Sequence, residues 1–157
     1  MDRSTAPCPA NDYLASHVAC LLASLRALTG ADLAPGRTGT EAARFVYEAP
    51  FVLLSHDTAA DPVFNYANQA AQSLFELDWP AFIALPSRFS AEAPNREERA
   101  RLLDRVTRQG YIDDYSGVRI ARSGRRFMID QAMVWNVADA QGRHYGQAAT
   151  FSHWRFL

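Results

Sequence analysis

The sequence contains no lysine, and all 16 of its basic residues are arginine. Its net charge of −1 gives no overall basic excess of the kind that nucleic-acid-binding proteins present. It has two cysteines, Cys8 and Cys20, too few for a disulfide framework or a thiolate metal site. No apolar run approaches the roughly 18 residues of a membrane span, and the first residues lack the apolar stretch of a signal peptide. We therefore expect a cytoplasmic protein with no membrane attachment and no direct nucleic-acid binding.

Sequence motifs of the common enzyme classes are absent as well. There is no G-x-S-x-G nucleophile motif, no glycine-rich phosphate loop, and no His-x-x-x-His or Cys-x-x-Cys metal spacing. Ser55, His56 and Asp57 are consecutive, but neighbouring side chains on a strand point to opposite faces, whereas a catalytic triad must converge. We therefore predict that the protein is not an enzyme.

The composition is typical of one globular domain. The hydrophobic fraction is 48% and the charged fraction 21%, which are ordinary values for a folded chain with a single core. Residues 1–40 contain a tail with two prolines, an amphipathic helix and a Gly/Pro/Thr-rich linker. Residues 41–157 contain the remaining strands and helices, and we predict that they form the main domain.

The N-terminal helix carries an apolar stripe. Asn11 is a suitable N-cap and Gly30 a suitable stop, and between them apolar residues recur at helical spacing. Such a face can pack on its own domain or on a second copy of the chain. We predict a homodimer that uses the positions Leu14, Val18, Leu22 and Leu25, with an exposed face of the sheet as a further candidate surface.

The remaining pattern predicts strands over residues 51–56, 63–67, 111–121, 126–138 and 144–155. Three helices separate the second strand from the third, and we expect Asn68, Asp78 and Asn95 to cap them. This order predicts an α+β fold, in which one five-stranded antiparallel sheet carries helices on one face, together with the N-terminal amphipathic helix.

Several of these segments resemble PAS domains, namely VFNYANQAA, SGRRF and DAQGRHYGQAATF. A longer match resembles the MEKHLA domain family over roughly residues 45–154, through the runs DPVFNYANQAAQSLFELDWPAFIALPSRFSAE and GYIDDYSGVRIARSGRRFMIDQAMVWNVADAQGRHYGQAATF. The resemblance implies a PAS-like fold with the strand order 2-1-5-4-3 and a sensory role. The family occurs in stand-alone bacterial proteins and at the C-terminus of plant class III homeodomain–leucine zipper transcription factors. The present sequence has neither homeobox nor zipper, so the transcription-factor function does not transfer.

The resemblance also implies a ligand pocket between the inner face of the sheet and the segment from Asn68 to Arg88. A flavin–cysteine photoreceptor would need a cysteine near LPSRFSAE, and a haem sensor commonly uses a histidine, which residues 68–110 lack. The sequence therefore assigns no cofactor. Arg88 and Arg119 favour a small anionic molecule, because a guanidinium binds carboxylate or phosphate with two parallel hydrogen bonds. The candidate ligand-binding residues are Tyr66, Asn68, Trp79, Arg88, Tyr115, Arg119, Gln131, Trp135 and Gln147.

Structural roles compete with these assignments. Asn68 can serve as a helix cap, Arg88 can pair with Glu92 or Asp114, and Tyr115 and Trp135 can be core residues. A bulge in strand 126–138 would decide whether Asp130 or Gln131 faces inward. The competing function is a protein-interaction or dimerisation module without a ligand, with a core filled by Trp79, Phe82, Tyr115 and Trp135. A cavity below the roughly 300 Å³ of ordinary ligand pockets would favour this alternative.

Overall fold

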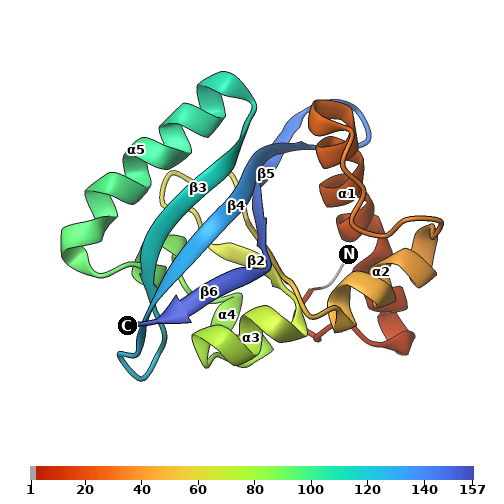
Figure 1. Ribbon diagram of the computed structural model, residues 1–157. Coiled ribbons are helices and arrows are strands. Elements are labelled where there is room, and N and C mark those ends of the chain that lie inside the picture. Colours follow the sequence, from red (N-terminus) through yellow and green to blue (C-terminus); the bar gives the residue numbers. More distant parts are fainter. Residues whose placement is uncertain (1–2) are drawn as a thin grey trace.

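The predicted strands form one antiparallel sheet. The computed structural model describes residues 3–157. Its strands β1 (Val52–His56), β2 (Phe64–Ala67), β3 (Tyr111–Ile120), β4 (Arg126–Ala138) and β5 (His144–Phe151) lie in the order β2-β1-β5-β4-β3 (Figure 1). The predicted fold class and strand order are therefore confirmed.

The final predicted strand is divided in two. Ser152 forms a bend, and the following strand β6 (His153–Phe156) pairs with the first part of β4, whereas β5 pairs with the second part. Between these two parts of β4, Gln131 adopts a left-handed conformation with φ 52°. At this point β4 has one residue more than its partner β3, which is a β-bulge. The bulge shifts the alternation of side chains in β4, so that Ile129 and Ala132 face the same cavity while Gln131 is exposed.

Helices cover both faces of the sheet, whereas the sequence predicted one covered face. Two consecutive residues of β4 mark the two sides. Trp135 Nε1 donates to the Leu21 carbonyl of α1 (Ala15–Thr29) at 3.1 Å, and Asn136 Nδ2 donates to the Val106 carbonyl of α5 (Ala93–Gln109) at 3.0 Å. In Figure 1, α5 lies on one side of the sheet and α1 with α2 (Gly39–Glu48) on the other.

The outer face is covered by the 3-10 helix η1 (Pro9–Leu14), α1 and α2. The four stripe residues predicted for a dimer are all at most 4% exposed within the single chain, because they pack in one cluster with Leu53, Tyr66 and Trp135. The prediction that this stripe forms the dimer interface is therefore wrong, since it already covers its own sheet. No helix of residues 3–157 is long and apolar enough to span a membrane.

The inner face is covered by α3 (Gln69–Phe75), α4 (Trp79–Phe82), the 3-10 helix η2 (Ser87–Ser90) and α5. The predicted caps of α3 and α4 are confirmed: the Asn68 and Asp78 side chains accept hydrogen bonds from the amides of Ala71 and Ala81. The predicted cap of α5 at Asn95 is wrong, because that helix begins at Ala93 and includes a proline in its first turn.

Candidate functional site

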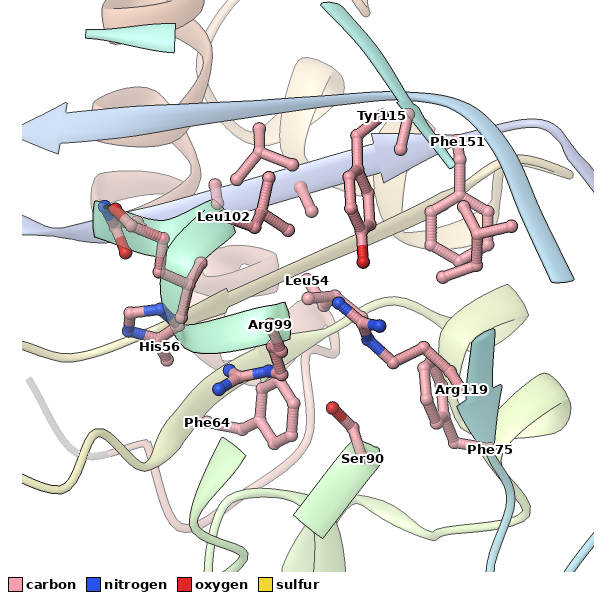
Figure 2. Close-up of a pocket in the computed structure, with 17 residues that line it drawn as sticks. Leu54, His56, Phe64, Phe75, Ser90, Arg99, Leu102, Tyr115, Arg119 and Phe151 are labelled. Atoms are coloured by element: carbon pink, nitrogen blue, oxygen red, sulfur yellow. Dashed lines mark hydrogen bonds between the residues drawn. The ribbon is translucent and has the colours of Figure 1, made fainter. Parts of the chain in front are cut away.

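A cavity of about 60 Å³ lies between the inner face of the sheet, η2 and α5 (Figure 2). Strands β1, β3, β4 and β5 form one wall, and α5 forms the opposite wall. The sequence placed the pocket against residues 68–88, but only Phe75 of that segment lines the cavity. Most of the lining is apolar and includes Leu54, Phe64, Phe75, Leu102, Leu103, Ile129, Val134 and Phe151.

Two buried arginines line this otherwise apolar space. Arg99 comes from α5 and Arg119 from β3, and their residues are only 8% and 6% exposed. Arg99 donates to Ser87 Oγ at 2.6 Å, and Arg119 donates to the Val118 carbonyl at 2.8 Å. Neither forms an ion pair with an acidic side chain of residues 3–157. Because a guanidinium has five N–H donors, both retain hydrogen-bonding capacity toward the cavity.

The two guanidinium charges act on one another. Burial, followed by the charge of Arg119, lowers the pKa of Arg99 to about 10. Arg99 therefore remains protonated at neutral pH. Asp61 and Glu98 act on Arg99 only weakly, and no carboxylate in the described part of the chain forms an ion pair with either arginine, so an anion placed between the two guanidinium groups would be stabilised.

His56, on β1, supplies a different group to the cavity. Its Nδ1 lies 2.9 Å from the Asp57 carbonyl, which can only accept a hydrogen bond, so Nδ1 carries the proton. Burial lowers the pKa of His56, and the charge of Arg99 adds to this effect; the hydrogen bond to the Asp57 backbone, the charge of Asp57 and the neighbouring Gln147 side chain partly offset it. The ring is thus neutral near pH 7. Its Nε2 is buried and has no hydrogen-bond partner in the described part of the chain.

Tyr115, Gln147 and Ser90 complete the polar part of the lining. The Tyr115 hydroxyl donates to Glu98 at 3.1 Å, and the Arg119 guanidinium carbon lies 5.3 Å from the centre of the Tyr115 ring. In Figure 2 the Tyr115 hydroxyl points toward this guanidinium. Gln147 pairs directly with His56 across β5 and β1, and its Nε2 lies 3.2 Å from the Leu103 carbonyl of α5. The Tyr115–Glu98 contact joins β3 to α5, and the Gln147–Leu103 contact joins β5 to α5.

Backbone space is tight at two glycines near the site. A Cβ at Gly117 would collide with the Tyr115 hydroxyl, and a Cβ at Gly146 would collide with the His56 carbonyl. Glycine at these positions therefore allows the Tyr115 ring to lie along its own strand and β1 to approach β5 closely.

The cavity brings together three of the nine predicted ligand-binding residues: Tyr115, Arg119 and Gln147. Tyr66 on β2, Trp135 on β4 and Trp79 on α4 all lie in the outer cluster, together with residues of α1 and η1. The remaining three, Asn68, Gln131 and Arg88, also lie outside the cavity lining.

Arg88 is exposed and pairs with Asp61 at 3.0 Å. The expected partners, Glu92 and Asp114, are therefore wrong; the segment that contains Arg88 does border the cavity, but the Arg88 side chain does not line it. The hairpin between β1 and β2 brings Asp61 to the start of η2, a contact between segments that local patterns do not specify.

Sequence reasoning missed Arg99 and His56. Arg99, Leu102, Leu103 and Val106 follow the helical steps of three, four and seven, so Arg99 lies on the buried face of α5 although charged residues surround it in the sequence. His56 alternates with Leu54 on β1, and Ser55 faces the opposite side, where its Oγ lies 3.1 Å from His17 Nε2. The predicted opposite orientation of Ser55 and His56 is confirmed.

Metal ligands and thiols are not part of this site as the structure describes it. Among residues 3–157 no group of three or more His, Cys, Asp or Glu side chains is arranged to hold a metal ion. The lining as described contains His56 as its one histidine and neither cysteine.

The sheet order and the covering helices define a PAS-like fold. A PAS domain from Colwellia psychrerythraea matches with a TM-score of 0.59 at 14% identity, covering 73% of this chain and 92% of that chain. An RNA-binding light-oxygen-voltage receptor matches with a TM-score of 0.59 at 19% identity, covering 68% of this chain and 30% of that chain. The light-state dimer of the fungal blue-light photoreceptor Vivid matches with a TM-score of 0.57 at 13% identity, covering 82% of this chain and 88% of that chain. At these identities the likeness establishes the fold alone.

The chain belongs to the MEKHLA domain family, whose model matches residues 15–156. This match includes α1, which the sequence resemblance over residues 45–154 left out. The homeobox-leucine zipper protein ATHB-14 of Arabidopsis thaliana is 26% identical over 134 residues, which are 82% of this chain and 16% of that protein. HOX10 of Oryza sativa subsp. indica is 28% identical over 96 residues, or 61% of this chain and 11% of that protein. The chain thus spans less than a fifth of these relatives.

Proposed function

We propose that this domain is a PAS-type sensory module that binds a small anion in the cavity between the sheet and α5. Membership of the MEKHLA family and the PAS-like fold support a sensory role. The observation that carries the proposal is the pair of buried arginines without an ion-pair partner among residues 3–157, Arg99 and Arg119, at a cavity whose described lining contains no Asp or Glu. An anion between them would form charge-assisted hydrogen bonds with both guanidinium groups.

The cavity volume limits the size of the ligand. A space of about 60 Å³ holds about two water molecules at roughly 30 Å³ each. A larger ligand would require α5 or η2 to move away from the sheet.

The same geometry suggests how binding could produce a signal. Arg99 belongs to α5 and Arg119 to β3 at the edge of the sheet. An anion that bridges them would replace their mutual repulsion by attraction and would hold the helix against the sheet. The occupied and empty states would then differ in the stability of α5, which is a change that a partner protein could recognise.

A second function is favoured by one observation. The cavity is well below the roughly 300 Å³ of ordinary ligand pockets, as expected for a protein-interaction or dimerisation module with a filled core. In that case the two arginines would be solvated by a few buried water molecules and would bind no metabolite.

Thermal-shift and calorimetric titrations with small carboxylates, phosphate and sulfate distinguish the two functions. The sensor function predicts that at least one anion raises the melting temperature, and that Arg99→Met and Arg119→Met each remove this effect. Arg101→Met is the matched control, since Arg101 lies on the same helix but is exposed and paired with Glu97. If no anion stabilises the wild-type protein, the interaction module replaces the sensor.

A further inference from the structure

We propose that the ligand of this cavity is a small hydroxycarboxylate, with its carboxylate between Arg99 and Arg119 and its hydroxyl donating a hydrogen bond to His56 Nε2. This inference rests on the proposed anion site and specifies the chemical class of its ligand.

The hydroxyl is inferred from the protonation of His56. The Asp57 carbonyl holds the proton on Nδ1, so Nε2 presents a lone pair. This atom is buried, the residue is 7% exposed and lines the cavity, and no described residue donates to it. A buried acceptor without a donor is costly, and a ligand with an O–H group would satisfy it.

The carboxylate is inferred from the donors on the other side of the cavity. Arg99 donates to Ser87 Oγ, and Arg119 donates to the Val118 carbonyl and also interacts with the Tyr115 hydroxyl; each guanidinium has further N–H groups left. Both are more than nine-tenths buried, so a ligand carboxylate would meet them with little competition from solvent. His56, Arg99 and Arg119 all line this one small cavity, so a single molecule inside it can contact them together (Figure 2).

Charge distinguishes a hydroxyl from an ammonium group as the donor. An amino acid would also offer an N–H to His56, but its ammonium would enter a space that already contains two guanidinium charges. The described lining has no Asp or Glu to compensate a third positive charge. A neutral hydroxyl adds none, so the site favours a hydroxy acid over an amino acid.

The walls distinguish a carbon compound from an inorganic anion. Phosphate also combines anionic oxygens with an O–H donor. However, Leu54, Leu102, Ile129 and Val134 surround the polar groups with apolar surface that would contact a short carbon chain. Glycolate and lactate are among the smallest members of this class, and either would bind with a small movement of α5 or η2 away from the sheet.

Isothermal titration calorimetry with matched pairs of acids tests the inference. Lactate is compared with propionate, and glycolate with acetate, on the wild-type protein at neutral pH. We expect each hydroxy acid to bind about ten-fold more tightly than its partner, because only the hydroxy acid satisfies Nε2. Lactamide, which keeps the hydroxyl but lacks the charge, should not bind.

Variants of His56 assign the preference to this residue. In His56→Leu the lactate and propionate affinities should become equal, while propionate still binds through the arginines. His56→Gln should keep part of the preference, since its amide oxygen can accept near the position of Nε2. His144→Leu is the matched control because His144 is exposed. Circular dichroism and melting temperature report whether each variant folds. The comparison of lactate with propionate on the wild-type protein stays valid even if a variant does not fold.

The possible failures are distinguishable. Equal binding of lactate and propionate to the wild type, with loss in Arg99→Met, would overturn the hydroxycarboxylate and leave the anion site intact. Tighter binding of phosphate than of any hydroxy acid would have the same consequence. If no anion binds at all, the proposed function and this inference are both wrong.

Discussion

At the scale of single residues, Asn68 shows how a sequence signal can have a purely structural cause. Its side-chain oxygen accepts from the amides of Leu53 and Ala71, and its amide group donates to the carbonyls of Val46 and Phe51. These contacts use the full hydrogen-bonding capacity of an asparagine. The residue joins α2, β1 and α3, and it has no donor or acceptor left for a ligand.

His17 holds the outer layer together in a comparable way. Its Nε2 lies 3.1 Å from Ser55 Oγ on β1, and its Nδ1 lies 2.9 Å from the Tyr145 hydroxyl on β5. Burial, followed by the charge of Arg3, lowers the pKa of His17 to about 3. The neutral ring is therefore a condition for the packing of α1 on the sheet.

This shifted pKa predicts a pH dependence of stability. The folded pKa lies below the unfolded value of about 6.5, so the unfolded state binds the additional proton and stability falls as the pH decreases between these values. The contribution should be about 2 kcal/mol between pH 7 and pH 5. Urea denaturation at both pH values should show a loss larger by this amount in the wild type than in His17→Gln. Equal losses in the two proteins would contradict the buried, neutral state of His17.

At the scale of elements, α1 behaves as part of the domain core. Leu22 is 4% exposed and packs in the outer cluster, whereas Leu28, near the end of the same helix, is 38% exposed. A homodimer remains a prediction, but it must use a surface other than the buried stripe.

Substitution of these two leucines tests the role of α1. Leu22→Asp should lower the free energy of unfolding by at least about 3 kcal/mol, because it buries an unpaired charge and removes apolar contacts. Leu28→Asp should change it by less than about 0.5 kcal/mol. Chemical denaturation measures stability, and light scattering measures the mass. A fully stable Leu22→Asp protein that merely changes from dimer to monomer would show that the stripe contacts a second copy instead.

The elements themselves could be predicted from the sequence because their signals are local. Alternating apolar residues, the Asn68 and Asp78 caps and the turns between strands indicate the sheet and most of the helices. The position of α1 could not be predicted, since an apolar stripe does not specify its partner. Arg99 was missed for a related reason: its burial depends on which side of α5 meets the sheet, and charged neighbours conceal the apolar stripe to which it belongs.

At the scale of the whole molecule, the two faces of the sheet have different roles. The outer face is closed by α1 and α2 around Trp135 and Tyr66; Trp135 donates to the Leu21 carbonyl, whereas the buried Tyr66 hydroxyl has no hydrogen-bond partner among residues 3–157. The inner face leaves a small cavity where two arginines and one histidine retain unused hydrogen-bonding groups.

The most direct measurement is an NMR titration that follows the arginine Nε–H resonances while lactate is added. Binding in the cavity predicts saturable shifts for Arg99 and Arg119, with backbone shifts at His56 and Gln147 on the paired strands. Exposed Arg101 and Arg122 should respond weakly and without saturation. Shifts confined to the exposed arginines, with Arg99 and Arg119 unchanged for lactate and every other anion tested, would contradict an anion site between the sheet and α5.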